Sequence, residues 1–210
     1  MPVHPFFALP RTTRPADWFE RILPTLQVSL PLVTVQQAVV YHVLGAGGGV
    51  WSVSLQEGRL RTQPGAMVGA VLQVSMTSGH FREALTGALR DRACAVLQRL
   101  GLPLDLPDFT RLPVDPVGVA QRLARLQGSL AVEVADRELA DRYRYVLTFG
   151  AGPAAYDTAT TTLEIDADDL AALATARTPP LKVLASGKLR IRGDADLPLR
   201  VLRAALGDRS

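Results

Sequence analysis

The length, composition and charge of this chain exclude several classes of protein. Its 210 residues suffice for one large domain or two small ones, and the 48% hydrophobic share supports a core packed mainly by aliphatic side chains, since aromatic residues make up only 6%. The formal charge is +3 and the arginines are spread along the chain, so the basic stripe of a nucleic-acid-binding protein is missing and we expect no nucleic-acid partner.

The cysteine and hydropathy patterns predict a cytoplasmic protein. Cys94 is the only cysteine, so no intramolecular disulfide can form, as is usual in a reducing compartment. The N-terminus lacks the charged start and apolar run of a secretory signal, and no stretch reaches the roughly 20 apolar residues that span a bilayer. We interpret Cys94 as a small buried hydrophobe rather than a reactive thiol.

The first half begins with a Pro-rich stretch, residues 1–15, which we expect to form an extended arm. A helix is predicted from Asp17 as its N-cap, and Pro24 should kink or end it. Alternating apolar residues and turn signals then predict a β-meander with strands over 38–44, 50–55, 59–63 and 71–76. Ser78 is expected to cap the helix that follows.

Three prolines between residues 101 and 114 indicate a linker. After it, Asp115-Pro116 predicts a helix start, and Asp166 and Asp194 or Asp196 are expected to begin two further helices. Strands are predicted over 130–134, 142–149, 160–165 and 188–192.

The two halves share an order of elements, in which a helix and a meander precede a strand that leads into an amphipathic helix. Residues 72–85 correspond in this order to residues 163–174. The sequence therefore predicts an α+β protein of two tandem units, residues 16–100 and 115–210. Whether these units pack side by side or share one sheet is left open.

The second unit resembles the sterol carrier protein type 2 family. Residues 163–170 give a strand and an acidic helix start as in that family, and residues 186–194 give its Gly-Lys-Leu-x-Ile-x-Gly-Asp strand before a leucine-rich last helix. The first unit is similar to the family over residues 49–58, 71–76 and 81–87, but no Gly-Lys strand follows Gly87. The second unit departs from the pattern by having Phe149-Gly150 where the family has an Asp/Glu-Gly turn.

The resemblance implies, for each unit, a curved and mainly antiparallel sheet covered by helices. Between sheet and helices the family holds an apolar tunnel for sterols, fatty acyl chains or fatty acyl-CoA. Such a tunnel needs few polar groups, because each buried methylene contributes about 0.8 kcal/mol. The residues expected to line it here are Met67, Met76, Phe81, Leu85, Leu170, Leu173, Leu184, Leu189 and Leu202.

Several motifs invite a catalytic or cofactor role, and each has a simpler interpretation. The glycine-rich run 45–49 precedes a strand rather than a helix, so it predicts a hairpin turn and not a dinucleotide loop. The three histidines lack metal-ligand spacing, and the acidic residues 166–169 suit a helix start. Ser186 lacks the Gly-x-Ser-x-Gly pattern of a nucleophile elbow. Lys188, Arg190 and Arg192 form a basic strand face that is either solvated or in contact with an anionic group.

We therefore expect a protein without catalytic activity, metal or cofactor that binds or transfers a hydrophobic ligand, namely a fatty acid, a fatty acyl-CoA or a sterol-like lipid. The alternative is a structural or interaction module, without a bound ligand, in an assembly for lipid or quinone metabolism. A membrane surface or another protein is the expected transient partner. The sequence leaves the oligomeric state open.

Overall fold

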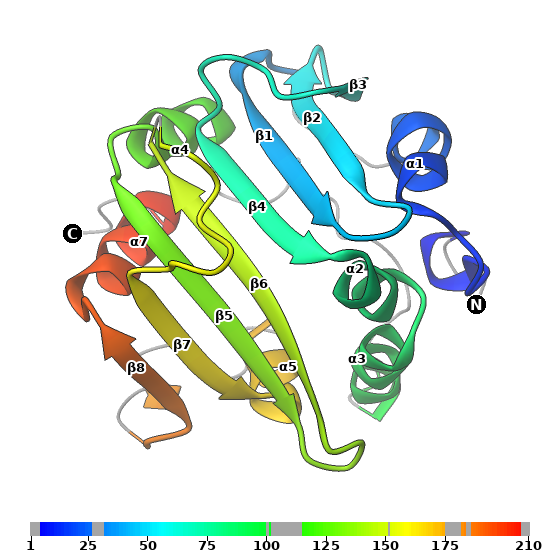
Figure 1. The fold of residues 1–210 in the computed structure, drawn as a ribbon, viewed down its shortest axis with the longest axis vertical. Helices are drawn as coiled ribbons and strands as arrows, with labels where there is room; N and C mark the ends of the chain where they lie inside the picture. The colour runs from blue at the N-terminus through cyan, green and yellow to red at the C-terminus, as the bar shows by residue number, and fades with distance from the viewer. Residues whose placement is uncertain are drawn as a thin grey trace.

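The computed structural model describes residues 5–26, 32–99, 101, 115–150, 152–174, 182–183 and 186–206. Strands from both predicted units join in one sheet of eight strands, in the order β3-β2-β1-β4-β6-β5-β7-β8 (Figure 1). The strands are β1 (Val35–Leu44), β2 (Gly49–Gln56), β3 (Arg59–Pro64), β4 (Leu72–Thr77), β5 (Gly128–Asp136), β6 (Asp141–Phe149), β7 (Thr161–Asp166) and β8 (Leu189–Gly193). Apart from Gly101, the predicted linker lies outside the described residues.

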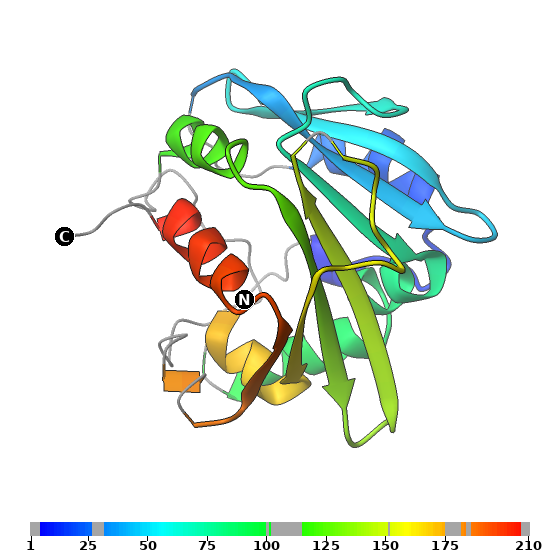
Figure 2. The same ribbon diagram turned by 60° about the vertical axis from the view of Figure 1, so that its left-hand side comes forward.

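The helices that pack on the sheet cover one of its faces, which we call the inner face (Figures 1 and 2). The helical segments are the 3-10 turn η1 (Pro5–Ala8), α1 (Pro15–Asp17), the π-helical turn η2 (Trp18–Ile22), the 3-10 turn η3 (Leu23–Thr25), α2 (Ser78–Leu85), α3 (Ala88–Arg99), α4 (Pro116–Leu123), α5 (Ala167–Ala174) and α7 (Asp196–Leu206). The fold is thus mixed α+β, with an open sheet.

The two halves of the sheet use the same pairing scheme. In each half, the first strand pairs antiparallel with the second and parallel with a later strand that runs directly into a helix: β1 pairs with β2 and β4, and β5 pairs with β6 and β7. The halves differ at their edges, because β3 has a place only in the first half and β8 only in the second. The predicted meander is therefore wrong at its last strand, since β4 pairs with β1 and not with β3.

This crossing of β4 has a physical reason. Strand β3 carries Arg59 and Arg61, which are exposed, and it forms one edge of the sheet. Strand β4 is buried on both faces at Ser75 and Met76, so it takes a central position. Residues 65–70 connect β3 to β4 across the face of the sheet opposite the helices, which we call the outer face. In this segment the Met67 N–H donates to Ser52 Oγ at 2.8 Å.

The halves meet where β4 pairs with β6. This antiparallel pairing runs from Leu72 opposite Phe149 to Ser75 opposite Val146. Beyond it the chain turns into α2, and the side chain of His80 continues the contact by accepting a hydrogen bond from the Arg144 N–H at 3.1 Å. The seam between the halves therefore combines a short ladder with a side chain that occupies the next backbone donor of β6.

Helix starts follow the predicted capping chemistry with two corrections. Asp115, Asp166 and Asp194 each accept a hydrogen bond from a backbone N–H two residues on, as predicted for α4, α5 and α7. For α2 the cap is Thr77 and not Ser78, since Thr77 Oγ1 accepts from the His80 N–H at 3.1 Å. The prediction of Asp17 as the N-cap of the first helix is also wrong.

The first helix begins at Pro15, because proline fixes a helical φ and needs no hydrogen-bonded N–H there. The predicted effect of Pro24 is confirmed, since the helix ends in the 3-10 turn that contains it.

The outer face is lined by small residues beneath irregular segments. Ala38, Val40, Ser52, Ser75 and Val146 are buried there, although the helices lie on the opposite side. Residues 152–160 cross this face and are held by hydrogen bonds from Gln73 to the Gly152 carbonyl and from Arg144 to the Tyr156 carbonyl. Short side chains let these segments approach the strands closely.

One sheet through both halves predicts that they unfold together. Leu197 of α7 is buried in the second half, so Leu197→Ala should cost about 2–5 kcal/mol through the cavity that it leaves. Both tryptophans, Trp18 and Trp51, lie in the first half and report on it by fluorescence. In urea, the fluorescence and far-UV circular dichroism transitions of this variant should shift together.

Leu139→Ala, at an exposed turn, is the control and should change the free energy of unfolding by no more than about 0.5 kcal/mol. A fluorescence midpoint that stays at the wild-type value in Leu197→Ala would show that the halves unfold independently.

Candidate ligand-binding site

The inner face of the second half carries an apolar layer between sheet and helices. Alternation along β5 and β7 directs their apolar side chains to this face, where α4, α5 and α7 cover them. The layer divides into two clusters. The α7 cluster is formed by buried Leu126, Leu130, Phe149, Leu197 and Ala204. The α5 cluster is formed by buried Val134, Tyr143, Ile165, Ala167 and Val183, with Leu170, Leu173 and Leu189 partly buried against them.

The nine predicted lining residues fall into separate groups. Met76, Phe81 and Leu85 are buried together in the first half, in what we call the aromatic cluster. Leu170, Leu173 and Leu189 come together in the α5 cluster. Two others join neither group, since Leu202 is partly buried on α7 and Met67 lies in the segment that crosses the outer face. The ninth, Leu184, lies outside the described residues.

The aromatic cluster is filled by its own rings. Phe19 stacks on Trp51 with ring centroids 4.9 Å apart, and its ring lies 5.0 Å from Tyr41 and 5.7 Å from Phe81. The indole N–H of Trp51 donates to Glu20 Oε1 at 3.0 Å, which fixes the ring from its polar edge. Because Phe19 is fully buried among these rings, the first half has a packed inner layer.

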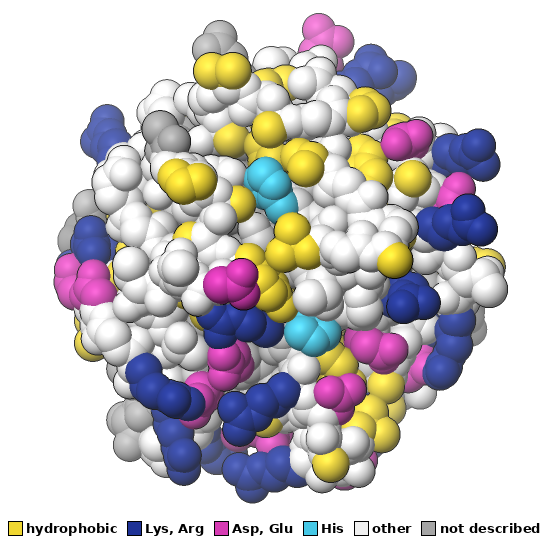
Figure 3. Space-filling view, in the orientation of Figure 1, with side chains coloured by type: hydrophobic (Ala, Val, Ile, Leu, Met, Phe, Trp, Pro, Cys, Tyr) yellow, Lys and Arg dark blue, Asp and Glu magenta, His cyan; other side chains and the backbone are white. Residues whose placement is uncertain are grey.

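A charged groove of about 350 Å³ opens at the ends of β5, β7 and β8. Four carboxylates border it, those of Glu133, Glu164, Asp166 and Asp169, together with the cations Arg137, Arg142, Lys188 and Arg190. Figure 3 shows the resulting mixture of positive and negative side chains over the lower part of the outer face. Of the predicted lining residues that the structure describes, none borders this groove or the second described hollow, of about 670 Å³ beside the β2–β3 turn.

Each carboxylate of the groove is neutralised by a cation. Glu133 pairs with Arg144 and, at 3.5 Å, with Arg142. Asp166 pairs with Arg137 at 3.1 Å and Asp169 with Lys188 at 2.7 Å. The remaining ion pair joins Glu164 to Arg192.

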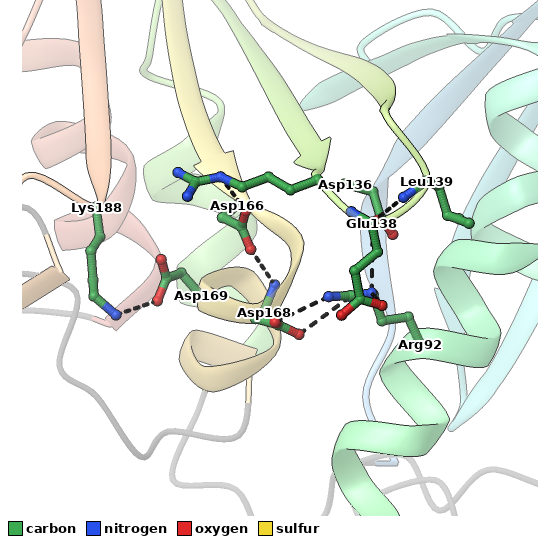
Figure 4. Close-up of polar contacts among 9 residues, drawn as sticks. Arg92, Asp136, Glu138, Leu139, Asp166, Asp168, Asp169 and Lys188 are labelled. Atoms are coloured by element: carbon green, nitrogen blue, oxygen red, sulfur yellow. Dashed lines mark hydrogen bonds and ion pairs between the residues drawn. The ribbon is translucent and has the colours of Figure 1, made fainter.

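The first turn of α5 is held from both sides (Figure 4). On one side Asp169 meets Lys188 at the start of β8, and on the other Asp168 receives a bidentate contact from Arg92 of α3, at 3.1 and 3.2 Å. Arg92 also donates to Glu138 at 2.6 Å. The hydrogen bonds from Arg92 to Glu138 and Asp168 hold its pKa above the usual value. These contacts tie the first half to the wall of the α5 cluster.

Asp136 anchors the turn after β5. Its side chain is fully buried, and its Oδ1 accepts from the backbone N–H groups of Glu138 and Leu139 at 3.0 and 3.1 Å. Arg92 lies 3.6 Å away and supplies the compensating charge. Removal of Arg92 would leave a buried carboxylate without a facing cation.

Residue types that often carry catalysis have structural partners here. Nε2 of His42 lies 3.0 Å from Gln73 Oε1, and the Ser186 hydroxyl donates to the Val183 carbonyl at 2.9 Å. Burial raises the pKa of the Cys94 thiol, which disfavours the nucleophilic thiolate. In the parts of the chain that the structure describes, no three His, Cys, Asp or Glu side chains gather as a metal site, and no helix is long and apolar enough to cross a membrane.

Only part of the groove was predicted from the sequence. The basic strand 188–192 and the acidic start of α5 were identified, but Glu133, Glu164, Arg142 and Arg144 were missed. These become neighbours through the register, which places Glu133 opposite both Arg144 and Glu164. The signal that could have found them is the charge pattern of three successive strands, with an acid within β5 and within β7 and two arginines two residues apart in β6.

The second half of the chain is similar in sequence to a family of sterol-transfer proteins. The sequence model of the SCP-2 sterol transfer family matches residues 109–204, a stretch that includes α4, strands β5 to β8 and all but the end of α7. No curated protein matches the chain.

The solved structures that are similar to this chain include two sterol carrier proteins and an alkylsulfatase. Sterol carrier protein 2 like 2 from Aedes aegypti has 15% identity and a TM-score of 0.30, with 54% of this chain and 93% of that chain covered. The sterol carrier protein domain 2 of Helicoverpa armigera has 14% identity and a TM-score of 0.32, covering 58% and 91%. The sec-alkylsulfatase Pisa1 from Pseudomonas sp. has 11% identity and a TM-score of 0.29, covering 61% and 25%.

The Arg92 contacts predict a specific loss of stability. Arg92→Met should lower the free energy of unfolding by about 1.5–3 kcal/mol, because hydrogen bonds to charged groups are lost and Asp136 stays buried. Arg137→Met is the matched control, since Arg137 also pairs with an aspartate beside α5 but is 86% exposed, so its loss should cost no more than about 1 kcal/mol. Urea titrations of both variants give the comparison, and equal losses would contradict the assigned role of Arg92.

Proposed function

We propose that this protein binds and carries a hydrophobic ligand, without catalysing a reaction on it, in the apolar layer of its second half. The observation that carries the proposal is the family match over residues 109–204, which spans the strands and helices that enclose the α5 and α7 clusters. The ligand class is a fatty acid, a fatty acyl-CoA or a sterol-like lipid.

Packing in the second half supports this assignment. Leu170 and Leu173 of α5 and Leu202 of α7 are only partly buried, although they belong to the helices that cover the inner face. An apolar chain that entered between these helices and the sheet would complete their burial, and each methylene would contribute about 0.8 kcal/mol. We assign the ligand to the second half because the aromatic rings already fill the corresponding layer of the first.

The filled aromatic cluster also favours a second role for the first half. A packed layer held to the other half through β4 and β6 suits a structural or interaction module. In this alternative, the whole chain is a structural part of an assembly in lipid or quinone metabolism and holds no ligand. A cytoplasmic location and transient contact with a membrane surface or a protein remain predictions from the sequence.

Native mass spectrometry of the protein as expressed, followed by organic extraction, separates the two roles. The carrier role predicts one bound acyl or sterol species per chain that the extraction releases. A protein that is empty and also ignores added fatty acid would favour the interaction module.

Uptake of a fluorescent fatty acid tests the location of the ligand. Leu173→Gln places a polar group in the α5 cluster and should weaken binding about tenfold or more, since a buried leucine side chain is worth about 1.5–3 kcal/mol. Leu139→Gln, at an exposed turn, should bind as the wild type does. Circular dichroism melting curves check that both variants fold, and unchanged uptake by folded Leu173→Gln would contradict the assignment to this cluster.

A further inference from the structure

The outer face of the first half carries an exposed apolar tip. Val68 is 98% exposed and lies in the middle of the segment 65–70 that connects β3 to β4. Ser52 Oγ holds this segment to the sheet, because it donates to the Gly65 carbonyl at 2.7 Å and accepts from the Met67 N–H at 2.8 Å. Val68 is therefore presented to solvent by backbone contacts that fix the residues before it.

The tip belongs to an uncharged part of the surface. Residues 62–70 include no charged side chain. Gly65 and Gly69 flank the tip with φ values of +88° and +79°, a conformation that favours glycine and turns the chain on either side of Val68. In Figure 3 hydrophobic side chains gather over the upper part of the outer face, whereas charged ones gather over the lower part.

Two arginines of the edge strand β3 lie on the same face as this tip. Arg61 is opposite Ser54 of β2, and residues directly opposite in an antiparallel pair have their side chains on one face. Ser54 is two residues from Ser52, beneath the segment that carries the tip, so it shares the outer face with Ser52. Arg59, two residues from Arg61 on β3, has the same orientation.

These two arginines have free guanidinium groups. Both are exposed, and in the part of the chain that the structure describes neither has an acidic partner. They border the hollow of about 670 Å³, and among the described residues around it Glu57 is the one acid. Arg59 and Arg61 thus retain the paired N–H donors with which arginine binds phosphate.

We propose that the outer face of the first half docks on an anionic phospholipid bilayer, with Val68 inserted below the head groups and Arg59 and Arg61 in contact with lipid phosphates. A bilayer surface has the matching order, since its anionic phosphates lie above an apolar interior. A stable protein interface buries about 1,200 Å² or more, which calls for a broader apolar surface than one tip. The proposal goes beyond the proposed function, because it gives a location and a lipid charge to the expected membrane contact and uses no residue of the α5 or α7 cluster.

Co-sedimentation of the full chain with lipid vesicles tests this surface. The wild type should bind vesicles of phosphatidylcholine mixed with phosphatidylglycerol about tenfold more tightly than vesicles of phosphatidylcholine alone, because each arginine at an anionic surface contributes about fivefold. Val68→Gln should weaken binding to the mixed vesicles about tenfold or more, since a buried valine is lost from the apolar interior. Arg61→Gln should weaken it about fivefold.

Matched controls use the same substitutions elsewhere on the surface. Leu139→Gln changes an exposed leucine in the turn after β5, and Arg190→Gln changes an exposed arginine of β8 at the other end of the sheet. Both should bind the mixed vesicles as the wild type does. All four variants should take up fluorescent fatty acid as the wild type does, so a failure of the carrier function is seen separately from a failure of docking.

Three outcomes would overturn the proposal. If the wild type binds neither kind of vesicle, the bilayer is the wrong partner and a protein becomes the occupant to search for. If it binds the mixed vesicles but Val68→Gln and Arg61→Gln bind equally well, docking uses another surface. If inorganic phosphate binds the wild type and displaces it from the mixed vesicles, while Val68→Gln binds those vesicles normally, the hollow is a site for a free anion.

Discussion

The pairing of β4 with β6 is the interaction on which the rest of the structure depends. A strand at a sheet edge presents unpaired backbone groups, and each half of this chain ends in such an edge where they meet. The β4 edge pairs with the β6 edge over only a few residues, and His80 extends the contact to the backbone of Arg144. Each half thereby supplies the neighbouring strand that the other half lacks. Strand β6 takes the place beside β4 that β8 takes beside β7, and β4 takes the place beside β6 that β3 takes beside β2.

This shared sheet gives the two halves different roles. A common inner face runs through both, but Phe19, Trp51 and Phe81 fill its first part with stacked and tilted rings. In the second part, aliphatic side chains from α5 and α7 are only partly buried. Arg92 joins these parts by binding Asp168 and facing Asp136, so a helix of the first half supports the wall of the second. In our account the first half is a scaffold, and the ligand is bound by the second.

Local chemistry in the sequence predicted most individual elements, and long-range pairing escaped it. Asp115-Pro116 and Asp166 marked helix starts correctly because a cap depends on a few adjacent residues. The β4 strand was placed in the chain but not in the sheet, because nothing local to residues 71–76 distinguishes pairing with β3 from pairing with β1. The same limit applied to the site: Met76 and Leu170 belong to separate clusters, and the acids and arginines of the groove became neighbours only through register.

Methyl NMR during titration with a long-chain fatty acid tests the central claim most directly, because it reports each cluster separately in the intact chain. The account predicts that the methyl resonances of Leu163, Leu170, Leu173 and Leu189 shift with saturation, while those of Val53 and Val74 beside the aromatic cluster stay unchanged. Shifts confined to the aromatic cluster, or no shift at a saturating concentration of fatty acid, would contradict a ligand site in the second half.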